Sequence, residues 1–357
     1  MRYMSPPGGG SVQPGQFHTV QILVLKDRKP GHYRQAEAIA ERLSSIEPAR
    51  IEAIDIEPRW YAHEALRRSS SRWSTRPDHL LRAFYGLRAA DLTRADIVVG
   101  SGRPTILAGL LLARLWGGRF VYRGIGTGYS FGPQDLVLVA SPRAAGNANR
   151  IYVPVPAPID PDTLPPPRRI ADSADLRGAS TSLLVGGDST THRFVEADWN
   201  RLAAFVEASA DTYGIRWSIT NSRRTPDAVS DMWTVMAARR DDVTFIDWRT
   251  AGVGSIDRLL AADVILVTSD SVSMIGDACN AMRPVLALDP ASTQPAGAAD
   301  VANVFAETGQ LERLSIADLD PAALAPTLAR LVVPPVSHRR HLEQVLTDWL
   351  ALRRRAA

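Results

Sequence analysis

Two residues near the start of the chain could activate a hydroxyl group for attack. Asp27 and His32 flank a Lys-Pro-Gly turn between an apolar run and a helical segment. A histidine titrates near neutral pH and can accept a proton from a hydroxyl. We therefore predict that His32, or its acidic neighbour Asp27, is a catalytic base. A solvated or helix-capping histidine is the alternative that these residues alone leave open.

A second turn between an expected strand and an expected helix carries Gly102 and Arg103. A glycine lets a ligand approach the backbone, and an arginine attracts an anion. We predict that both residues bind substrate.

A third turn follows the apolar run 181–185 and has the sequence Gly-Gly-Asp-Ser-Thr-Thr. Backbone amides of such a glycine turn, followed by hydroxyl residues that enter a helix, would form a cradle for phosphate or diphosphate. The Gly-Lys-[Ser/Thr] ending of a P-loop is missing. Asp188 is unsuited to phosphate binding and is expected only to cap the helix. The predicted substrate-binding residues here are Gly186, Gly187, Ser189, Thr190 and Arg193.

Two further strand ends in the second half carry candidate residues. The backbone after Ile246 could hold the edge of a nucleobase. The strand 264–270 ends in Ser-Asp and leads into Ser-Val-Ser, where hydroxyls and the amino end of a helix suit phosphate oxygens. Asp277, on the early turns of that helix, could accept both hydroxyls of a ribose. The predicted substrate-binding residues are Ile246, Ser269, Asp270, Ser271, Val272, Ser273 and Asp277.

Composition excludes several classes of protein. The 357 residues carry a net charge of +3, which is no basic stripe, so no nucleic-acid partner is expected. One cysteine, Cys279, excludes an internal disulfide and a cysteine-based zinc site, and we predict a packed thiol and no metal. No Gly-x-Gly-x-x-Gly turn follows the first strand, which argues against a nicotinamide-binding site.

The order of apolar runs and helical segments predicts an α/β protein with two doubly wound parallel sheets. Expected helices cover 34–43 and 105–116. The predicted strands are 20–25, 51–56, 96–102, 119–125 and 136–140 in the first half and 181–187, 216–220, 243–248, 264–270 and 284–289 in the second.

A proline-rich segment, 153–169, separates the two series and indicates a semi-rigid connection. We predict a disordered tail at 1–18, a first domain at 19–155, a linker at 156–178 and a second domain at 179–336. A closing helix at 337–357 should pack back on the first domain.

That closing helix has an alternative function. Leu342, Val345, Leu346, Trp349 and Leu352 would share one face, and arginines follow at 353–355. Such a helix could instead contact anionic lipid at a membrane surface. Without a signal sequence or an apolar run of roughly 18 residues, we expect a cytoplasmic protein, with the inner face of the membrane as the alternative place.

Three segments resemble the mitochondrial-fission ELM family, which is grouped with glycosyltransferases of the GT-B fold. They are Lys26–Leu43, Leu183–Ser189 and, most specifically, Leu259–Cys279. The Pro-Gly-His32 turn is also similar to the Gly-Gly-His turn of the transferase that makes lipid II. The resemblance implies two facing Rossmann-like domains with a cleft between them, the first for the acceptor and the second for a nucleotide-sugar.

By this resemblance the chain is an inverting, metal-independent glycosyltransferase that uses a nucleoside diphosphate sugar as substrate and needs no cofactor. Residues 186–190 and 271–273 would contact the donor diphosphate, with Arg103 or Arg193 assisting. Asp277 would stand where these enzymes usually have a ribose-binding glutamate. Bacterial relatives favour a lipid or cell-envelope glycan as acceptor.

Two other functions stay open at this point. The plant relatives act in organelle fission, so the chain could be a non-catalytic adaptor at a membrane surface, and the short Asp277 agrees with that alternative. A sugar-nucleotide 2-epimerase shares the two-domain fold, but it would need several carboxylates and histidines in the cleft, and His32 is the only one convincingly placed.

Overall fold

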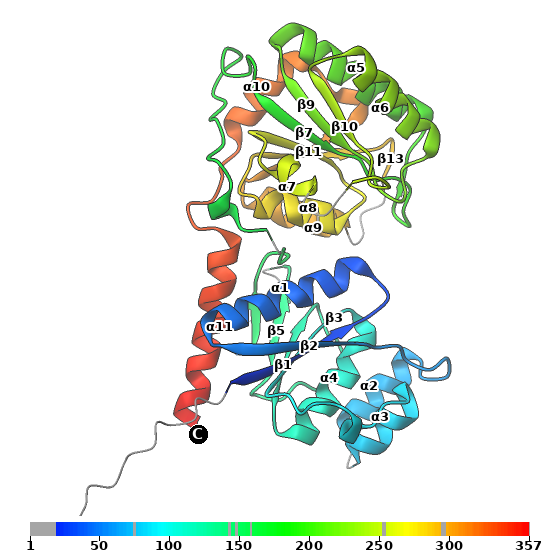
Figure 1. Cartoon of the computed structure of the whole chain (residues 1–357), viewed down its shortest axis with the longest axis vertical. Coiled ribbons are helices and arrows are strands. Elements are labelled where there is room, and N and C mark those ends of the chain that lie inside the picture. Colours follow the sequence, from blue (N-terminus) through cyan, green and yellow to red (C-terminus); the bar gives the residue numbers. More distant parts are fainter. Residues whose placement is uncertain are drawn as a thin grey trace, which may run out of the picture.

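The computed structural model describes residues 19–73, 76–141, 144–146, 149–157, 159–251, 255–293 and 298–356. The chain forms two halves, each built on a six-stranded sheet (Figure 1). The predicted tail, 1–18, lies outside the described residues.

In the first half the six strands pair in the order β2-β1-β3-β4-β5-β6, every pair parallel. The run Ile-Val-Val-Gly-Ser of β3 is buried at every position, as expected for a parallel strand covered on both faces. The elements are β1 (Val20–Lys26), α1 (Pro30–Ile46), β2 (Ala49–Asp55), α2 (Glu64–Trp73), α3 (Pro77–Tyr85), β3 (Ile97–Ser101), α4 (Arg103–Trp116), β4 (Arg119–Arg123), β5 (Leu136–Val139) and β6 (Arg150–Tyr152).

The second half repeats this plan with the order β10-β9-β7-β11-β12-β14, again all parallel. A short antiparallel pair, β8 with β13, lies beside it. The elements are β7 (Ser180–Leu184), β8 (His192–Arg193), α5 (Glu196–Tyr213), β9 (Arg216–Thr220), α6 (Asp227–Arg239), β10 (Val243–Ile246), α7 (Ser255–Leu260), β11 (Val264–Thr268), α8 (Val272–Asn280), β12 (Val285–Asp289), β13 (Ser292–Thr293), α9 (Ala298–Glu307), β14 (Leu311–Ser315) and α10 (Pro321–Arg330). The last helix, α11 (His338–Ala356), returns to the first half.

Each sheet has an apolar core on both of its faces. In the first half α3 and α4 cover one face, while α1 and α11 cover the other. In the second half α5, α6 and α10 cover one face, while α8 and α9 cover the other. The predicted α/β class with two doubly wound parallel sheets is therefore confirmed.

The strand order places one switch point in each sheet. The chain winds outward in opposite directions from β1 and β3 in the first half, and from β7 and β11 in the second. Ligands of such sheets bind outside the carboxyl ends of the strands at the switch point. The loops after β1, β3, β7 and β11 are therefore the places to look for a site.

The chain crosses between the halves twice. Val153 belongs to a core of the first half, and Val155, two residues later, belongs to a core of the second. The second crossing is at the start of α11, where His338 contacts Phe305 of the second half and Leu342 enters the core of the first. The Pro-rich crossing is packed, because the Nδ2 group of Asn280 donates to the carbonyl of Val155 over 2.6 Å.

Helix α11 runs along the first half (Figure 1). Its apolar side chains are buried there, and the indole of Trp349 donates to the carbonyl of Gln134 and packs under Arg119. Each buried side chain of this size contributes roughly 1.5–3 kcal/mol. Of the residues predicted to share the apolar face, Leu352 is 63% exposed and the other four are buried in this core, as expected for a closing helix. The buried residues of α11 are Leu342, Val345, Leu346, Trp349 and Leu350.

Among the described residues, no helix is both long enough and apolar enough to cross a bilayer.

Candidate active site

Asp27 and His32 form a hydrogen-bonded pair at the carboxyl end of β1. The Nδ1 group of His32 lies 2.6 Å from Oδ2 of Asp27. The Asp27 side chain is 4% exposed and the imidazole is 35% exposed. The other Asp27 oxygen accepts a bond from the Lys29 amide, which fixes the carboxylate. The pair therefore holds an imidazole in one orientation with Nε2 available for a substrate proton.

Gly102 lies directly against this pair at the carboxyl end of β3. Its φ of +87° is in the region that favours glycine. A Cβ atom here would stand 2.3 Å from Nδ1 of His32 and 2.5 Å from Oδ2 of Asp27. Both the backbone conformation and the packing require glycine, so the loops after β1 and β3 meet at this point.

Arg103 is the first residue of α4 and lies mostly in solvent, with 69% of its side chain exposed. Its Nη1 group donates to Oε2 of Glu64 on α2 over 2.9 Å. The predicted anion-binding arginine is therefore next to the Asp27–His32 pair but already holds a carboxylate.

The predicted phosphate cradle of the second half is filled by a side chain of the protein. The Gly187 amide donates to Oδ2 of Asp270 over 3.2 Å, and a Cβ at Gly186 would lie 2.2 Å from both Asp270 oxygens. The Gly186 amide donates to Thr268. The amides of this turn are therefore not free for phosphate, because Asp270 occupies the place expected for the anion.

Arg224, in the loop after β9, was not predicted and completes this cluster. Its Nη2 group pairs with Oδ2 of Asp270, whose side chain is fully buried, while the arginine itself is 43% exposed. Oδ1 of Asp270 is buried without a hydrogen-bond partner. No sequence signal could identify Arg224, since its partner is 46 residues away.

The segment from Ser189 to Arg193 does not begin a helix, which corrects the prediction. Ser189 instead closes a turn, its amide donating to the carbonyl of His192, and β8 follows. Asp188 caps this turn, accepting from the Phe194 amide and from Arg193. Helix α5 starts only at Glu196. No helix amides lie at Ser189.

Three predicted residues of this region lie in solvent or in local contacts. Thr190 is exposed. Arg193 is bound to Asp188 over 2.8 Å. The carbonyl of Ile246, expected to meet a base, accepts a bond from Thr220 over 2.8 Å. Residues 252–254 of the loop that follows β10 lie outside the described residues.

The turn after β11 leads into α8 as predicted. The Oγ of Ser271 accepts from the Met274 amide and caps the helix, so Val272 and Ser273 are its first helical residues. Their amides have no intrahelical acceptor and point to the amino end of α8. Ser269 is turned away from this end, donating to Asp289 over 2.5 Å.

Asp277 on α8 faces the first half of the molecule. It pairs with Arg34 of α1, Oδ2 to Nη1, over 3.5 Å. Burial raises the pKa of Asp277 to about 6, against the opposing effect of Arg34. Close by, a Cβ at Gly31 would stand 2.5 Å from Oγ of Ser273. The enclosed space among these residues is about 10 Å³, room for about one water molecule.

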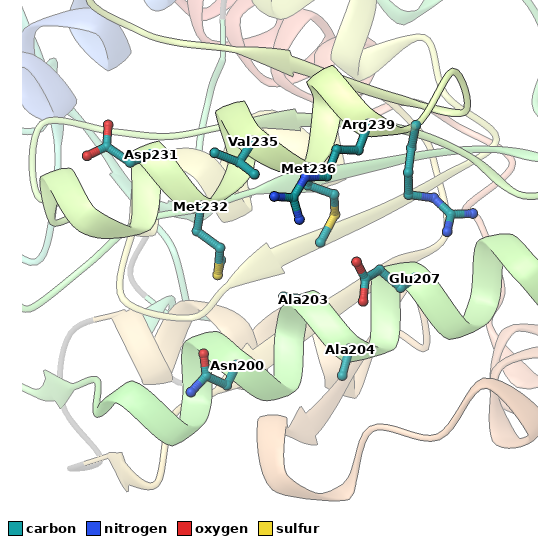
Figure 2. A pocket seen from close by; sticks show the side chains of 10 residues that line it. Asn200, Ala203, Ala204, Glu207, Asp231, Met232, Val235, Met236 and Arg239 are labelled. Atoms are coloured by element: carbon teal, nitrogen blue, oxygen red, sulfur yellow. The ribbon is translucent and has the colours of Figure 1, made fainter.

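Two other features do not join this site. Cys279 is buried, and burial raises the pKa of its thiol, as expected for a packed cysteine. A larger open hollow of about 480 Å³ lies between α5 and α6, where Met232 and Met236 face Ala203 (Figure 2). Among the described residues, no group of three His, Cys, Asp or Glu side chains could hold a metal ion.

Comparisons with known proteins agree with this architecture. A family model described as Mitochondrial fission ELM1 matches residues 30–326. No curated protein sequence matches the chain. The S. aureus MnaA–UDP co-structure is similar with a TM-score of 0.54 and 13% identity, over 94% of this chain and 98% of that one.

Two further structures are similar in the same way. The glycosyltransferase of kitacinnamycin has a TM-score of 0.51 and 13% identity, over 93% of this chain and 96% of that one. SnogD, a glycosyltransferase from Streptomyces nogalater, has a TM-score of 0.50 and 15% identity, over 94% of this chain and 100% of that one. At such identities the likeness establishes the fold, which is GT-B.

Proposed function

Because the chain belongs to the Mitochondrial fission ELM1 family and has the GT-B fold, we propose that it transfers a sugar from a nucleoside diphosphate sugar to a hydroxyl acceptor. One observation carries this proposal. The switch point of the first sheet holds a hydrogen-bonded Asp27–His32 pair, and α1, which follows that pair, meets α8 of the second half.

The acceptor would be activated at His32. The acceptor hydroxyl transfers its proton to Nε2 while its oxygen attacks the anomeric carbon of the donor. The bond from that carbon to the diphosphate breaks, and the diphosphate leaves with the electron pair on the opposite face, so the anomeric configuration inverts. Asp27 holds Nδ1–H and stabilises the imidazolium that forms, as an orienting carboxylate does beside other catalytic histidines.

The leaving diphosphate would be stabilised in the second half. The groups that would stabilise it are the Arg224 guanidinium and the amino end of α8 at Val272 and Ser273. Asp270 would act as a positioning residue that holds Arg224 in place. Such fixed donors supply the charge stabilisation that a metal ion provides in other transferases.

The ribose of the donor would bind Asp277, in the place where Arg34 now lies. A carboxylate accepts two hydroxyl hydrogen bonds, so the sugar would have to displace the 3.5 Å contact with Arg34. The two crossings at Val153–Val155 and at the start of α11 would allow the halves to separate and close. Closure would exclude water and limit donor hydrolysis.

A lipid or cell-envelope glycan is the acceptor class that we propose, which would put the enzyme at the inner face of a membrane. The surface that meets the membrane would not be the apolar face of α11, since most of that face is buried.

The test compares two histidines. Release of nucleoside diphosphate from a panel of nucleotide-sugars, with mixed cell-envelope glycans as acceptors, is measured for the wild type, for His32→Ala and for His79→Ala, an exposed histidine of α3. We expect His32→Ala to lose at least about 100-fold in turnover, while His79→Ala keeps it. Equal turnover of the two variants would remove His32 from the mechanism. A folded wild type with no turnover on any donor would favour the adaptor function.

A further inference from the structure

A cluster of three arginines and one glutamate lies beside the Asp27–His32 pair. We propose that this cluster, formed by Arg67, Arg68, Arg103 and Glu64, binds a phosphate or diphosphate group on the acceptor. Only the identification of the ligand as the acceptor rests on the proposed function. The anion site itself is inferred from contacts within the cluster.

Arg67 of α2 is a buried cation that has no carboxylate partner among the described residues. The residue is 7% exposed, and its Nη1 group donates to the carbonyls of Arg103 and Pro104 at 3.3 and 3.4 Å. Its Nε group is buried and has no hydrogen-bond partner. A buried charge normally has a counter-ion. Arg67 therefore keeps a positive potential under the first turn of α4.

Glu64 is the counter-ion that the cluster holds in the free protein. One of its oxygens accepts from Arg68, through Nε at 3.1 Å, and the other accepts from Arg103. Arg68 and Arg103 are 39% and 69% exposed, so a ligand can reach both. Three arginines against one glutamate leave the cluster with a charge of about +2.

The loop after β4 closes the other side of the cluster. Tyr129 is 8% exposed, and its hydroxyl has no hydrogen-bond partner in the part of the chain that the structure describes. Burial raises its pKa, and its charged neighbours are Arg67, Glu64, Arg68 and Arg103. In the same loop, Gly128 has a φ of +84° and brings the backbone against the stem of Arg68. A buried phenol hydroxyl therefore lies near the same charges.

The cationic groups of this cluster outnumber its one carboxylate, so a phosphoryl group would be a better partner for them than Glu64 alone. Two guanidinium groups that a ligand can reach, those of Arg68 and Arg103, share Glu64 beside the first turn of α4, and arginine pairs with phosphate in a two-point geometry. Gly102, which precedes Arg103, touches Asp27 and His32. A phosphate bound at Arg103 would therefore place its neighbouring hydroxyl near the base, and Glu64 would give way to it.

The test is calorimetry of the full chain with pyrophosphate at low salt, in the presence of saturating UDP to fill the second half. We expect Arg103→Met to weaken pyrophosphate binding about tenfold. We expect Glu64→Gln to tighten it, by up to about fivefold, because a resident anion is removed. Arg72→Met is the control, an exposed arginine in the last turn of α2, and should bind as the wild type does.

Circular dichroism confirms that each variant is folded. The proposal is overturned if pyrophosphate does not bind, if Arg103→Met binds it as tightly as the wild type does, or if Glu64→Gln weakens binding, as expected of a glutamate with only a structural role. If UDP does not bind but pyrophosphate still binds in a way that depends on Arg103, the proposed donor site is rejected and the arginine cluster is kept as an anion site. Decyl diphosphate binding more tightly than pyrophosphate would assign the phosphate to a lipid acceptor, and equal affinity would assign it to a soluble one.

Discussion

Single residues decide whether the proposed base can work, and Gly102 shows this most directly. It has a positive φ, and it leaves room for the Asp27–His32 hydrogen bond that a Cβ would strike. Gly117, at the end of the same α4 helix, has a similar φ of +67° but nothing within 4 Å of its would-be Cβ. Gly117 lies in the left-handed helical region with a ψ of 21°, whereas Gly102, with a ψ of 147°, lies close to a region essentially restricted to glycine. Gly117→Ala is therefore the control for a positive-φ glycine without the contact.

We expect Gly102→Ala to lower turnover at least about tenfold more than Gly117→Ala does, although both variants pay a strain of about 1–3 kcal/mol. Nucleoside diphosphate affinity should be the same in both, since the change lies in the first half. Steady-state rates and calorimetry check this. If the two variants have equal turnover, the contact with the pair has no part in catalysis.

At this scale the sequence was informative only for neighbours along the chain. Asp27 and His32 are five residues apart across one turn, so both could be predicted as candidate bases, although as alternatives and not as a hydrogen-bonded pair. Arg224 and Asp270 are 46 residues apart, and Glu64 and Arg103 are 39 apart. Their pairing depends on how the sheets fold, and no local pattern reports it.

Among the elements, the buried parallel strands were predicted well. Strands such as β3 and β11 are continuous apolar runs, which is a strong signal. Two of the four edge strands, β2 and β10, were predicted, and the other two were missed for physical reasons: β6 has only three residues, and β14, Leu-Glu-Arg-Leu-Ser, has charged residues at its second and third positions. The helix expected at Ser189 was wrong because Asp188 caps a turn instead.

The start of α11 carries a prediction for pH dependence. His338 is buried, and its Nε2–H donates to the side-chain oxygen of Gln310 over 2.7 Å. Burial lowers the pKa of His338 to about 4, below the roughly 6.5 of an unfolded histidine. The unfolded chain therefore binds more protons between these values, so stability is complete above pH 6.5 and falls as the pH drops toward 4.

We expect the free energy of unfolding of the wild type, measured with urea, to fall between pH 7 and pH 4.5. The full loss would be on the order of 3 kcal/mol. The loss should be smaller in His338→Gln, which cannot gain the proton. His79→Gln, an exposed control, should follow the wild type. If the free energy of unfolding changes with pH to the same extent in the wild type and in His338→Gln, then His338 does not cause the pH dependence.

At the scale of the whole molecule, two switch points are brought together by two crossings of the chain. Neither Gly31 against Ser273 nor Arg34 with Asp277 could be predicted, because each pair joins residues of different halves. The two-domain plan itself could be predicted, since the Pro-rich segment separates two complete series of strands. The packing of that segment into the second core, through Val155, was not evident from its composition.

Binding of a nucleoside diphosphate by the second half is tested most directly by calorimetry with UDP, GDP, ADP and dTDP. We expect at least one of them to bind the wild type, and Arg224→Met to weaken that binding about tenfold. Arg223→Met, the exposed neighbouring arginine, should change it little. No binding of any of the four by the folded protein, or equal binding by the two arginine variants, would contradict the account.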